Sequence, residues 1–122
     1  MAKILIIEDE PVLLKILTEK FRSVGWIVAG ASDGEEGMDL IGKSTFDVVL
    51  LDLLLPKKDG FQVLREVRAV SGLKDLPILI ISNLGSEDDI RMAIDLGATD
   101  YLIKTQHSLK EIVEKTSSYI KN

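Results

Sequence analysis

The segment Val48–Leu55 reads VVLLDLLL, and Asp52 is its one polar residue. A short, continuous apolar run with β-branched residues is typical of a strand that helices cover on both faces. An ionised carboxylate among such neighbours needs compensation, because burying an unpaired charge is costly. The segment therefore predicts a buried strand that ends in a polar site, with Asp52 as the most informative residue of the chain.

Four similar apolar runs lie on either side of this strand, and a polar turn and then a stretch with helical spacing follow each run. The runs are Ile4–Ile7, Trp26–Ala29, Ile78–Ile81 and Tyr101–Ile103. Five alternations of strand and helix imply right-handed crossovers and a parallel sheet. We therefore expect an α/β fold: a three-layer, doubly wound, five-stranded parallel sheet with helices on both faces.

The expected helices are marked by their ends. Pro11 suits the first turn of a helix, and Gly25 is expected to stop the apolar stripe that follows. Capping signals mark three other helix starts: Asp33 with Glu36, Ser108 with Glu111, and Ser86 before the acidic run 87–89. These signals support the alternation of strands and helices.

Length and charge narrow the possible functions. The chain has 122 residues, a formal net charge of −5 and no cysteine, so we expect one domain over residues 1–122, with no room for an output domain. The acidic balance argues against direct binding to nucleic acid, because phosphate contacts need clustered Lys and Arg. The absence of cysteine excludes thiol catalysis and thiolate metal sites. The run Ile4–Ile7 is too short for a signal peptide or membrane span, so we expect a cytoplasmic protein without a membrane partner.

Polar residues follow four of the five apolar runs. They are Glu8, Asp9 and Glu10 after the first run, Asp52 after the third, Ser82 and Asn83 after the fourth, and Lys104 after the fifth. In a doubly wound sheet, ligands bind beyond the carboxyl ends of the strands, so these side chains are expected at one edge. Carboxylates gathered there repel one another and favour a hard divalent cation, and Mg²⁺ is typically held by one or two carboxylates with waters and phosphate oxygens.

Two further residues turn this acidic edge into a predicted phosphoryl site. Lys104 offers a compact positive donor for a phosphate oxygen, and Ser82 offers a hydroxyl donor. Asp52 would be the nucleophile and would form an acyl phosphate. The metal and Lys104 would neutralise the charge on the equatorial oxygens during in-line transfer.

These segments resemble the receiver domains of two-component response regulators, including the single-domain chemotaxis type, over nearly the whole chain. The resemblance lies in ILIIEDE (residues 4–10), LLDLLLPKKDG (50–60), Ile78–Ser82 and GATDYLIK (97–104). It implies a flavodoxin-like receiver fold with strand order 2-1-3-4-5. It also implies that the chain is not an enzyme but a phosphoacceptor that assists its own phosphorylation and slow dephosphorylation.

The resemblance further implies roles for individual residues. Asp52 accepts a phosphoryl group from a histidine kinase or phosphotransfer protein. Asp9 would ligate Mg²⁺ directly and Glu8 largely through water, Asp52 would belong to the same metal site, and the backbone carbonyl of Leu54 would complete it.

The resemblance also implies a switch, in which Ser82 and Tyr101 move together when Asp52 is modified. Phosphorylation adds negative charge and acceptor oxygens, which can draw the Ser82 hydroxyl closer and vacate space for the Tyr101 ring. The surface of the fourth helix, fifth strand and fifth helix would then change shape for an unidentified downstream protein.

The sequence departs from the family pattern at several positions. Thr105 follows Lys104 where receivers usually have a proline after a cis bond, so we expect a trans bond or a strained cis one, and a trans bond could shift Lys104. Asn83 stands where a small residue is usual and can narrow access for small phosphodonors. Leu54 and Leu84 cannot orient a water, so we expect a long-lived phosphorylated form. Lys57 and Lys58 are interpreted as two solvated lysines.

The sequence leaves three alternatives to a phosphorylated receiver. A phosphotransferase of the haloacid-dehalogenase-like type needs a second Asp at the position of Leu54. A nucleotide- or flavin-binding domain would need a glycine- or hydroxyl-rich loop where residues 8–10 are all acidic, and these would repel a phosphate. The third alternative is a receiver that has lost phosphorylation and acts as a constitutive binding scaffold, which the substitutions at Thr105 and Asn83 favour.

Overall fold

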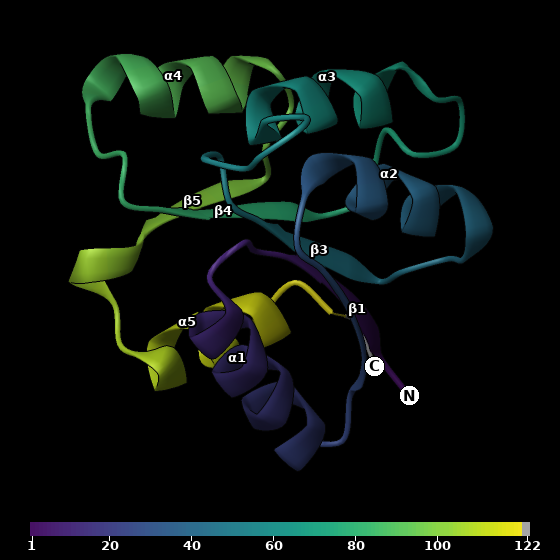
Figure 1. Ribbon diagram of the computed structural model, residues 1–122, viewed down its shortest axis with the longest axis vertical. Helices are drawn as coiled ribbons and strands as arrows, with labels where there is room; N and C mark the ends of the chain where they lie inside the picture. The colour runs from purple at the N-terminus through teal and green to yellow at the C-terminus, as the bar shows by residue number, and fades with distance from the viewer. Residues whose placement is uncertain (121–122) are drawn as a thin grey trace.

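Five parallel strands form one sheet in the order β2-β1-β3-β4-β5 in the computed structural model, which describes residues 1–120 (Figure 1). The strands are β1 (Lys3–Ile7), β2 (Ile27–Ala31), β3 (Val48–Leu51), β4 (Ile78–Ser82) and β5 (Asp100–Ile103). The predicted class, strand number and strand order are confirmed. The expected single domain over 1–122 also includes two residues, 121 and 122, that lie outside the described part.

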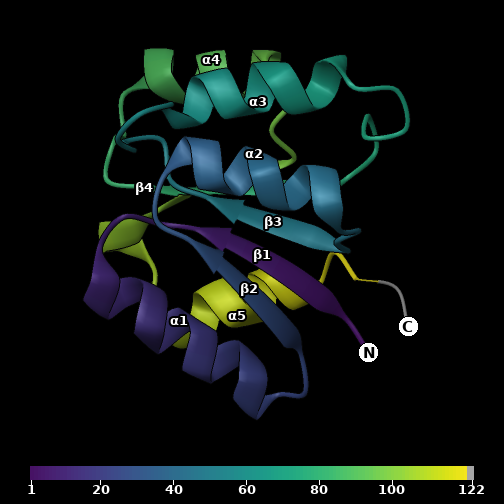
Figure 2. The ribbon, with the colours of Figure 1, turned by 45° about the vertical axis from the view of Figure 1, so that its right-hand side comes forward.

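Five helices alternate with the strands. They are α1 (Pro11–Ser23), α2 (Gly34–Lys43), α3 (Gly60–Ala69), α4 (Glu87–Asp95) and α5 (Leu109–Ser117), with a short 3₁₀ turn, η1 (Lys104–Gln106), before the last. Helices α1 and α5 cover one face of the sheet, while α2, α3 and α4 cover the other (Figure 2). Among residues 1–120, none of the helices has the length and apolar character needed to cross a membrane.

Alternate residues of the central strands fill two separate cores. On β1, Leu5 and Ile7 pack toward α2, α3 and α4, whereas Ile4 and Ile6 pack toward α1 and α5. Because successive side chains of a strand point to opposite faces, a strand buried on both sides is apolar at every position. This accounts for the uninterrupted apolar run of β3, all of whose residues are buried.

The helix ends follow the capping signals closely. The side chains of Asp33, Ser86 and Ser108 each accept a hydrogen bond from a backbone N–H three residues later. Ser108 and Glu111 form the reciprocal capping box. In a reciprocal capping box Glu36 would accept the Asp33 N–H, but its side chain accepts the Ser32 N–H, at 3.1 Å. The cap at Asp33 is therefore not a reciprocal capping box.

Strands β1, β4 and β5 each extend one residue beyond their predicted runs, and β2 differs most from its predicted bounds. β2 was expected over Trp26–Ala29 but runs over Ile27–Ala31, because its ladder with β1 continues through Gly30 opposite Ile6. Pairing in a ladder depends on backbone groups, so a glycine that breaks the apolar pattern need not end the strand.

Candidate functional site

Three carboxylates meet at the carboxyl edge of the sheet. Each of Glu8, Asp9 and Asp52 offers an oxygen within 4.8 Å of the other two. The cause is the register of the sheet: β1 and β3 pair in parallel and end together at Ile7 and Leu51, so the next residues emerge side by side. Glu8 is fully buried and Asp52 is 3% exposed, whereas Asp9 faces solvent. The structure thus brings together the three acids that the sequence placed at one edge.

Lys104 reaches this cluster from the end of β5. Its Nζ lies 2.9 Å from Asp52 Oδ2, to which it donates a hydrogen bond, and 2.6 Å from Glu8 Oε1. The bond between Lys104 and Thr105 is trans, as are all peptide bonds of the described residues. The trans bond does not move Lys104 away from the site.

Burial and charge change the titration of these groups. Burial raises the pKa of Glu8 to about 7; the Lys104 ammonium opposes this rise, and the neighbouring Asp52 charge adds to it. Burial alone would lower the pKa of Lys104, but Glu8 and Asp52 outweigh it and raise that pKa. One ammonium therefore does not fully compensate the acids around it.

The residues of this cluster fit a hard divalent cation. Glu8 Oε1 is buried without a hydrogen-bond partner among the described residues, since its contact with Lys104 lacks hydrogen-bond geometry. Three carboxylates with a single lysine leave an excess of negative charge. Oxygen ligands of this kind are the ones that Mg²⁺ takes in proteins.

Ser82 and Tyr101 lie beside the cluster and share a neighbour. Ser82 is fully buried at the end of β4, and its Oγ accepts a hydrogen bond from the Leu84 N–H at 3.2 Å. The carbonyl of Leu84 accepts from the Tyr101 hydroxyl at 2.5 Å, and burial raises the pKa of Tyr101. The backbone of Leu84 therefore connects the Ser82 hydroxyl and the Tyr101 ring through its two flanking peptide groups, a role that no side-chain pattern could have indicated.

Leu54 and Asn83 occupy the rim of the site. The Leu54 N–H donates to Asp52 Oδ1 at 3.2 Å, and its side chain is exposed. Asn83 follows Ser82 directly and is also exposed. The side chains of Leu54 and Leu84 both lack a polar group.

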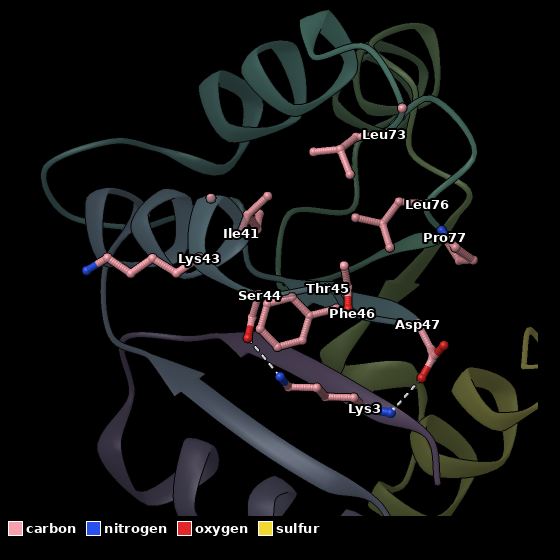
Figure 3. Close-up of a pocket in the computed structure, with 12 residues that line it drawn as sticks. Lys3, Ile41, Lys43, Ser44, Thr45, Phe46, Asp47, Leu73, Leu76 and Pro77 are labelled. Carbon is pink, nitrogen blue, oxygen red and sulfur yellow. Dashed lines mark hydrogen bonds between the residues drawn. The ribbon is translucent and has the colours of Figure 1, made fainter.

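A cavity of about 810 Å³ lies at the opposite end of the strands (Figure 3). Lys3 begins β1 there, and Asp47 directly precedes β3. Lys3 Nζ donates to Ser44 Oγ at 2.8 Å, and the Lys3 N–H donates to Asp47 Oδ2 at 2.7 Å. Lys3, Ser44 and Asp47 are thereby paired with one another, and Leu73 and Leu76 contribute apolar side chains to the lining. The cavity does not compete with the acidic edge as a reactive site.

The structure is thus a doubly wound α/β domain whose parallel sheet carries three acids and a lysine at its carboxyl edge. The family model described as "Response regulator receiver domain" matches residues 4–117. The chain belongs to the response regulator receiver domain family, as its sequence motifs predicted.

Curated relatives share the receiver but are longer. A probable transcriptional regulator, ycf27 of Guillardia theta, is 41% identical over 102 residues, which cover 84% of this chain and 39% of the relative. RpaA of Synechocystis, described as a DNA-binding dual master transcriptional regulator, is 38% identical over 104 residues, covering 85% of this chain and 43% of the relative. The chain thus spans less than half the length of these relatives.

Solved structures match along nearly the whole chain. The chemotaxis protein CheY4 of Vibrio cholerae is 27% identical, with a TM-score of 0.91, over 98% of this chain and 99% of that one. TrrA of Thermotoga maritima, described as a response regulator in complex with Mg²⁺ and BeF, is 26% identical, with a TM-score of 0.86, over 98% of this chain and 100% of that one.

The expectation that excluded nucleic acid as a partner was wrong. Several relatives are named as transcriptional regulators, and RpaA as DNA-binding. The net charge of a receiver concerns only its own surface. The net charge of this chain therefore does not indicate what the other parts of such longer regulators bind.

Proposed function

We propose that this chain is a two-component receiver that accepts a phosphoryl group on Asp52 and passes the signal on through a protein-binding surface. The observation that carries the proposal is the contact of Asp52 Oδ2 with Lys104 Nζ, at 2.9 Å, inside a cluster of three carboxylates. Membership of the receiver family and the likeness to a response regulator described as a Mg²⁺ and BeF complex support it.

The proposed transfer is an in-line displacement from a phosphohistidine. An Asp52 carboxylate oxygen forms the new O–P bond while the P–N bond breaks, and the imidazole nitrogen keeps the electron pair and takes up a proton from solvent. Lys104 donates to an oxygen of the transferred group. The product is an acyl phosphate on Asp52, which water later hydrolyses slowly.

The metal site is assigned to the same edge. Asp9, Asp52 and the Leu54 carbonyl would hold Mg²⁺, with Glu8 acting largely through water. When bound, the ion supplies positive charge to the phosphoryl oxygens.

The proposed switch uses the buried hydroxyl of Ser82. The phosphoryl oxygens attract this hydroxyl away from the Leu84 N–H. Because the Leu84 carbonyl also accepts the Tyr101 hydroxyl, a shift of this peptide reaches the face formed by α4, β5 and α5. A histidine kinase or phosphotransfer protein supplies the phosphoryl group, and the names of the relatives support an output in gene regulation.

Mass spectrometry after incubation with Mg²⁺ and acetyl phosphate, or with a phosphorylated histidine kinase, tests the proposal. We expect a gain of one phosphoryl group in the wild type and in Asp47→Asn, a carboxylate at the other end of the strands, but not in Asp52→Asn. Failure with every donor would favour the second candidate, a constitutive binding scaffold, which the exposed Asn83 beside Ser82 and the Thr105 substitution support.

A further inference from the structure

We infer that the start of α2 positions the metal-binding loop: Gly34 and Asp33 hold the segment 52–59, which carries the Leu54 carbonyl, in the shape that Mg²⁺ requires. This inference rests on the proposed function, because it assigns supporting residues to the same metal site.

The close approach is between α2 and the backbone of the loop. A Cβ atom added to Gly34 would lie 1.9 Å from the Lys58 carbonyl oxygen and 2.7 Å from its carbon. Both distances are far below van der Waals contact, and the atoms belong to backbone rather than to a flexible side-chain end. Any side chain at position 34 therefore displaces the loop or the helix.

The loop conformation at this contact is strained. Lys57 has φ of +67°, and it is the one non-glycine residue with positive φ in residues 1–120. The next N–H, that of Lys58, donates to the Pro56 carbonyl at 2.8 Å, which makes the turn tight. A non-glycine residue in this left-handed region is strained and persists only where its surroundings hold it.

Ion pairs anchor the turn to the helices on either side. Lys57 Nζ lies 3.5 Å from Asp33 Oδ2, at the start of α2, while Asp33 Oδ1 accepts the Glu36 N–H as an N-cap. Lys58 Nζ lies 2.6 Å from Glu66 Oε1 on α3. The interpretation of Lys58 as a solvated lysine is therefore wrong, and the turn is fixed from two helices.

A displacement of this turn reaches the metal site because both ends of the loop are fixed. The Gly60 N–H donates to the Leu53 carbonyl at 2.9 Å, and the Leu54 N–H donates to Asp52 Oδ1 at 3.2 Å. The short segment 54–59 between these bonds cannot absorb a shift at Lys58 without moving the Leu54 peptide. Mg²⁺ requires near-ideal octahedral geometry, so a misplaced carbonyl lowers its affinity.

Three glycines of α2 provide a matched test. Gly34→Ala meets loop backbone, Gly37→Ala instead meets the Ile7 side chain, whose Cδ1 would be 2.5 Å away, and Gly42→Ala meets nothing within 4 Å. By calorimetric titration with Mg²⁺, we expect Gly34→Ala to bind about 10-fold more weakly or worse, the range typical of supporting residues at metal sites. The other two variants should bind like the wild type. Affinity for Ca²⁺ should fall less, because its coordination is more flexible.

A second pair of variants covers the case in which Gly34→Ala does not fold. Asp33→Asn keeps an acceptor for the helix cap but loses the charge that pairs with Lys57, whereas Asp39→Asn removes the same charge from an exposed position of α2. We expect weaker Mg²⁺ binding only in Asp33→Asn. Equal Mg²⁺ affinity in the wild type, Gly34→Ala and Asp33→Asn would overturn the inference. If the wild type binds no Mg²⁺, the proposed function itself fails.

Discussion

Lys104 is the residue on which the charge balance of the site depends. Its side chain is 11% exposed and contacts Glu8 and Asp52 at once. In the unmodified protein this ammonium offsets the repulsion between two buried carboxylates. Because an ammonium has three donors, it can also bind an oxygen of an incoming phosphoryl group without leaving Asp52. In the proposed mechanism the same group would therefore stabilise both the resting site and the phosphorylated one.

The lifetime of the phosphorylated form is expected to depend on Leu54. Its exposed side chain cannot orient an attacking water, so label on Asp52 of the wild type should persist well beyond seconds. Leu54→Asn should speed hydrolysis by about 10-fold, equivalent to about 1.4 kcal/mol in the barrier. Leu54→Met, which is also apolar, should not. Decay of ³²P-labelled protein measures all three rates, and loss of label from the wild type within seconds would contradict the expectation.

Tyr119 is expected to make stability depend on pH through Asp100. Asp100 Oδ2 accepts the Tyr119 hydroxyl at 2.7 Å. Burial would raise the pKa of Asp100, but this bond, the Tyr101 N–H and Lys115 outweigh it and lower that pKa below 3.8. A lowered carboxyl pKa stabilises the fold above pH 3.8 and loses this contribution as pH falls below it.

Urea unfolding of Tyr119→Phe at several pH values tests this. At pH 7 we expect a loss of about 1 kcal/mol in the free energy of unfolding, since the bond is charged but partly exposed. The difference from the wild type should shrink as the pH falls below the ordinary carboxyl range. A difference that stays constant down to pH 2 would show that the hydroxyl does not act through the Asp100 charge.

Side-chain chemistry was enough to predict which residues gather at the site, but not how the loops join them. Glu8, Asp52 and Lys104 were predictable because parallel strands end at one edge, so polar residues after separate strands meet there. The role of the Leu84 backbone could not be predicted, because every residue carries the same backbone groups. Their direction depends only on the path of the loop. The Lys58 ion pair was missed for a related reason, since its partner Glu66 lies on a helix that the loop itself orients.

At the scale of elements, Arg68 joins three segments on one side of the sheet. It lies in the last turn of α3. Its Nε and Nη2 donate to the Gly97 carbonyl at 2.9 and 2.7 Å, and its Nη1 donates to the Leu73 carbonyl at 2.7 Å. Gly97 follows α4 with φ of +108°, and a Cβ there would lie 2.7 Å from Arg68 Cγ. The end of α4 is thereby fixed to α3, while its start follows the Ser82–Leu84 loop.

Replacing Arg68 should therefore loosen the end of α4. We expect Arg68→Ala to lower the free energy of unfolding by about 2 kcal/mol, because two part-buried carbonyls lose a charged donor. Arg65→Ala removes an exposed arginine from the same helix that bonds only to the Gln62 side chain, and it should cost much less. Urea denaturation compares the two, and equal losses would show that the bonds to Gly97 and Leu73 add nothing.

Helix starts were easier to predict than strand bounds. The caps at Asp33, Ser86 and Ser108 depend on a local side-chain bond that the sequence shows directly. The extension of β2 through Gly30 depends instead on pairing with β1, which is distant in sequence. A helix cap can be predicted from the sequence of one segment, whereas the length of a strand ladder depends on two paired segments.

At the scale of the whole molecule, the sheet is buried unevenly. All of β3 and β4 is buried, whereas β2 at the edge is mostly part-exposed. Both hydrophobic cores include residues of β1, β3 and β4, so separating these strands exposes most of the apolar interior at once.

Native-state hydrogen exchange should follow this gradient. Hydrogen-bonded amides of β3 and β4 are expected to exchange only through global unfolding, with the full dependence on denaturant. Amides of β2 that bond to β1 should exchange faster, through local opening of the edge. Equal exchange free energies in β2 and β4 would contradict the expectation, and mass spectrometry or NMR of the exchanged protein measures them.

The whole-molecule charge was the weakest guide to function. A net charge of −5 includes the three carboxylates that the fold gathers at one edge, two of which are buried, so it is a poor description of the surface that meets a partner. The fold class could be predicted because five repeats of one pattern leave few topologies. The partner of the domain could not, because it is recognised by a surface whose shape forms only in three dimensions.

The single tryptophan of the chain lies far from the phosphoryl chemistry. Trp26 precedes β2 at the amino ends of the strands and meets Phe21 of α1 edge-on, with ring centroids 5.3 Å apart. Its emission therefore reports the packing of α1 on the sheet rather than the state of Asp52. Intrinsic fluorescence can follow unfolding equally in samples with and without the acyl phosphate, while occupancy of Asp52 must be read by an added label or by mass.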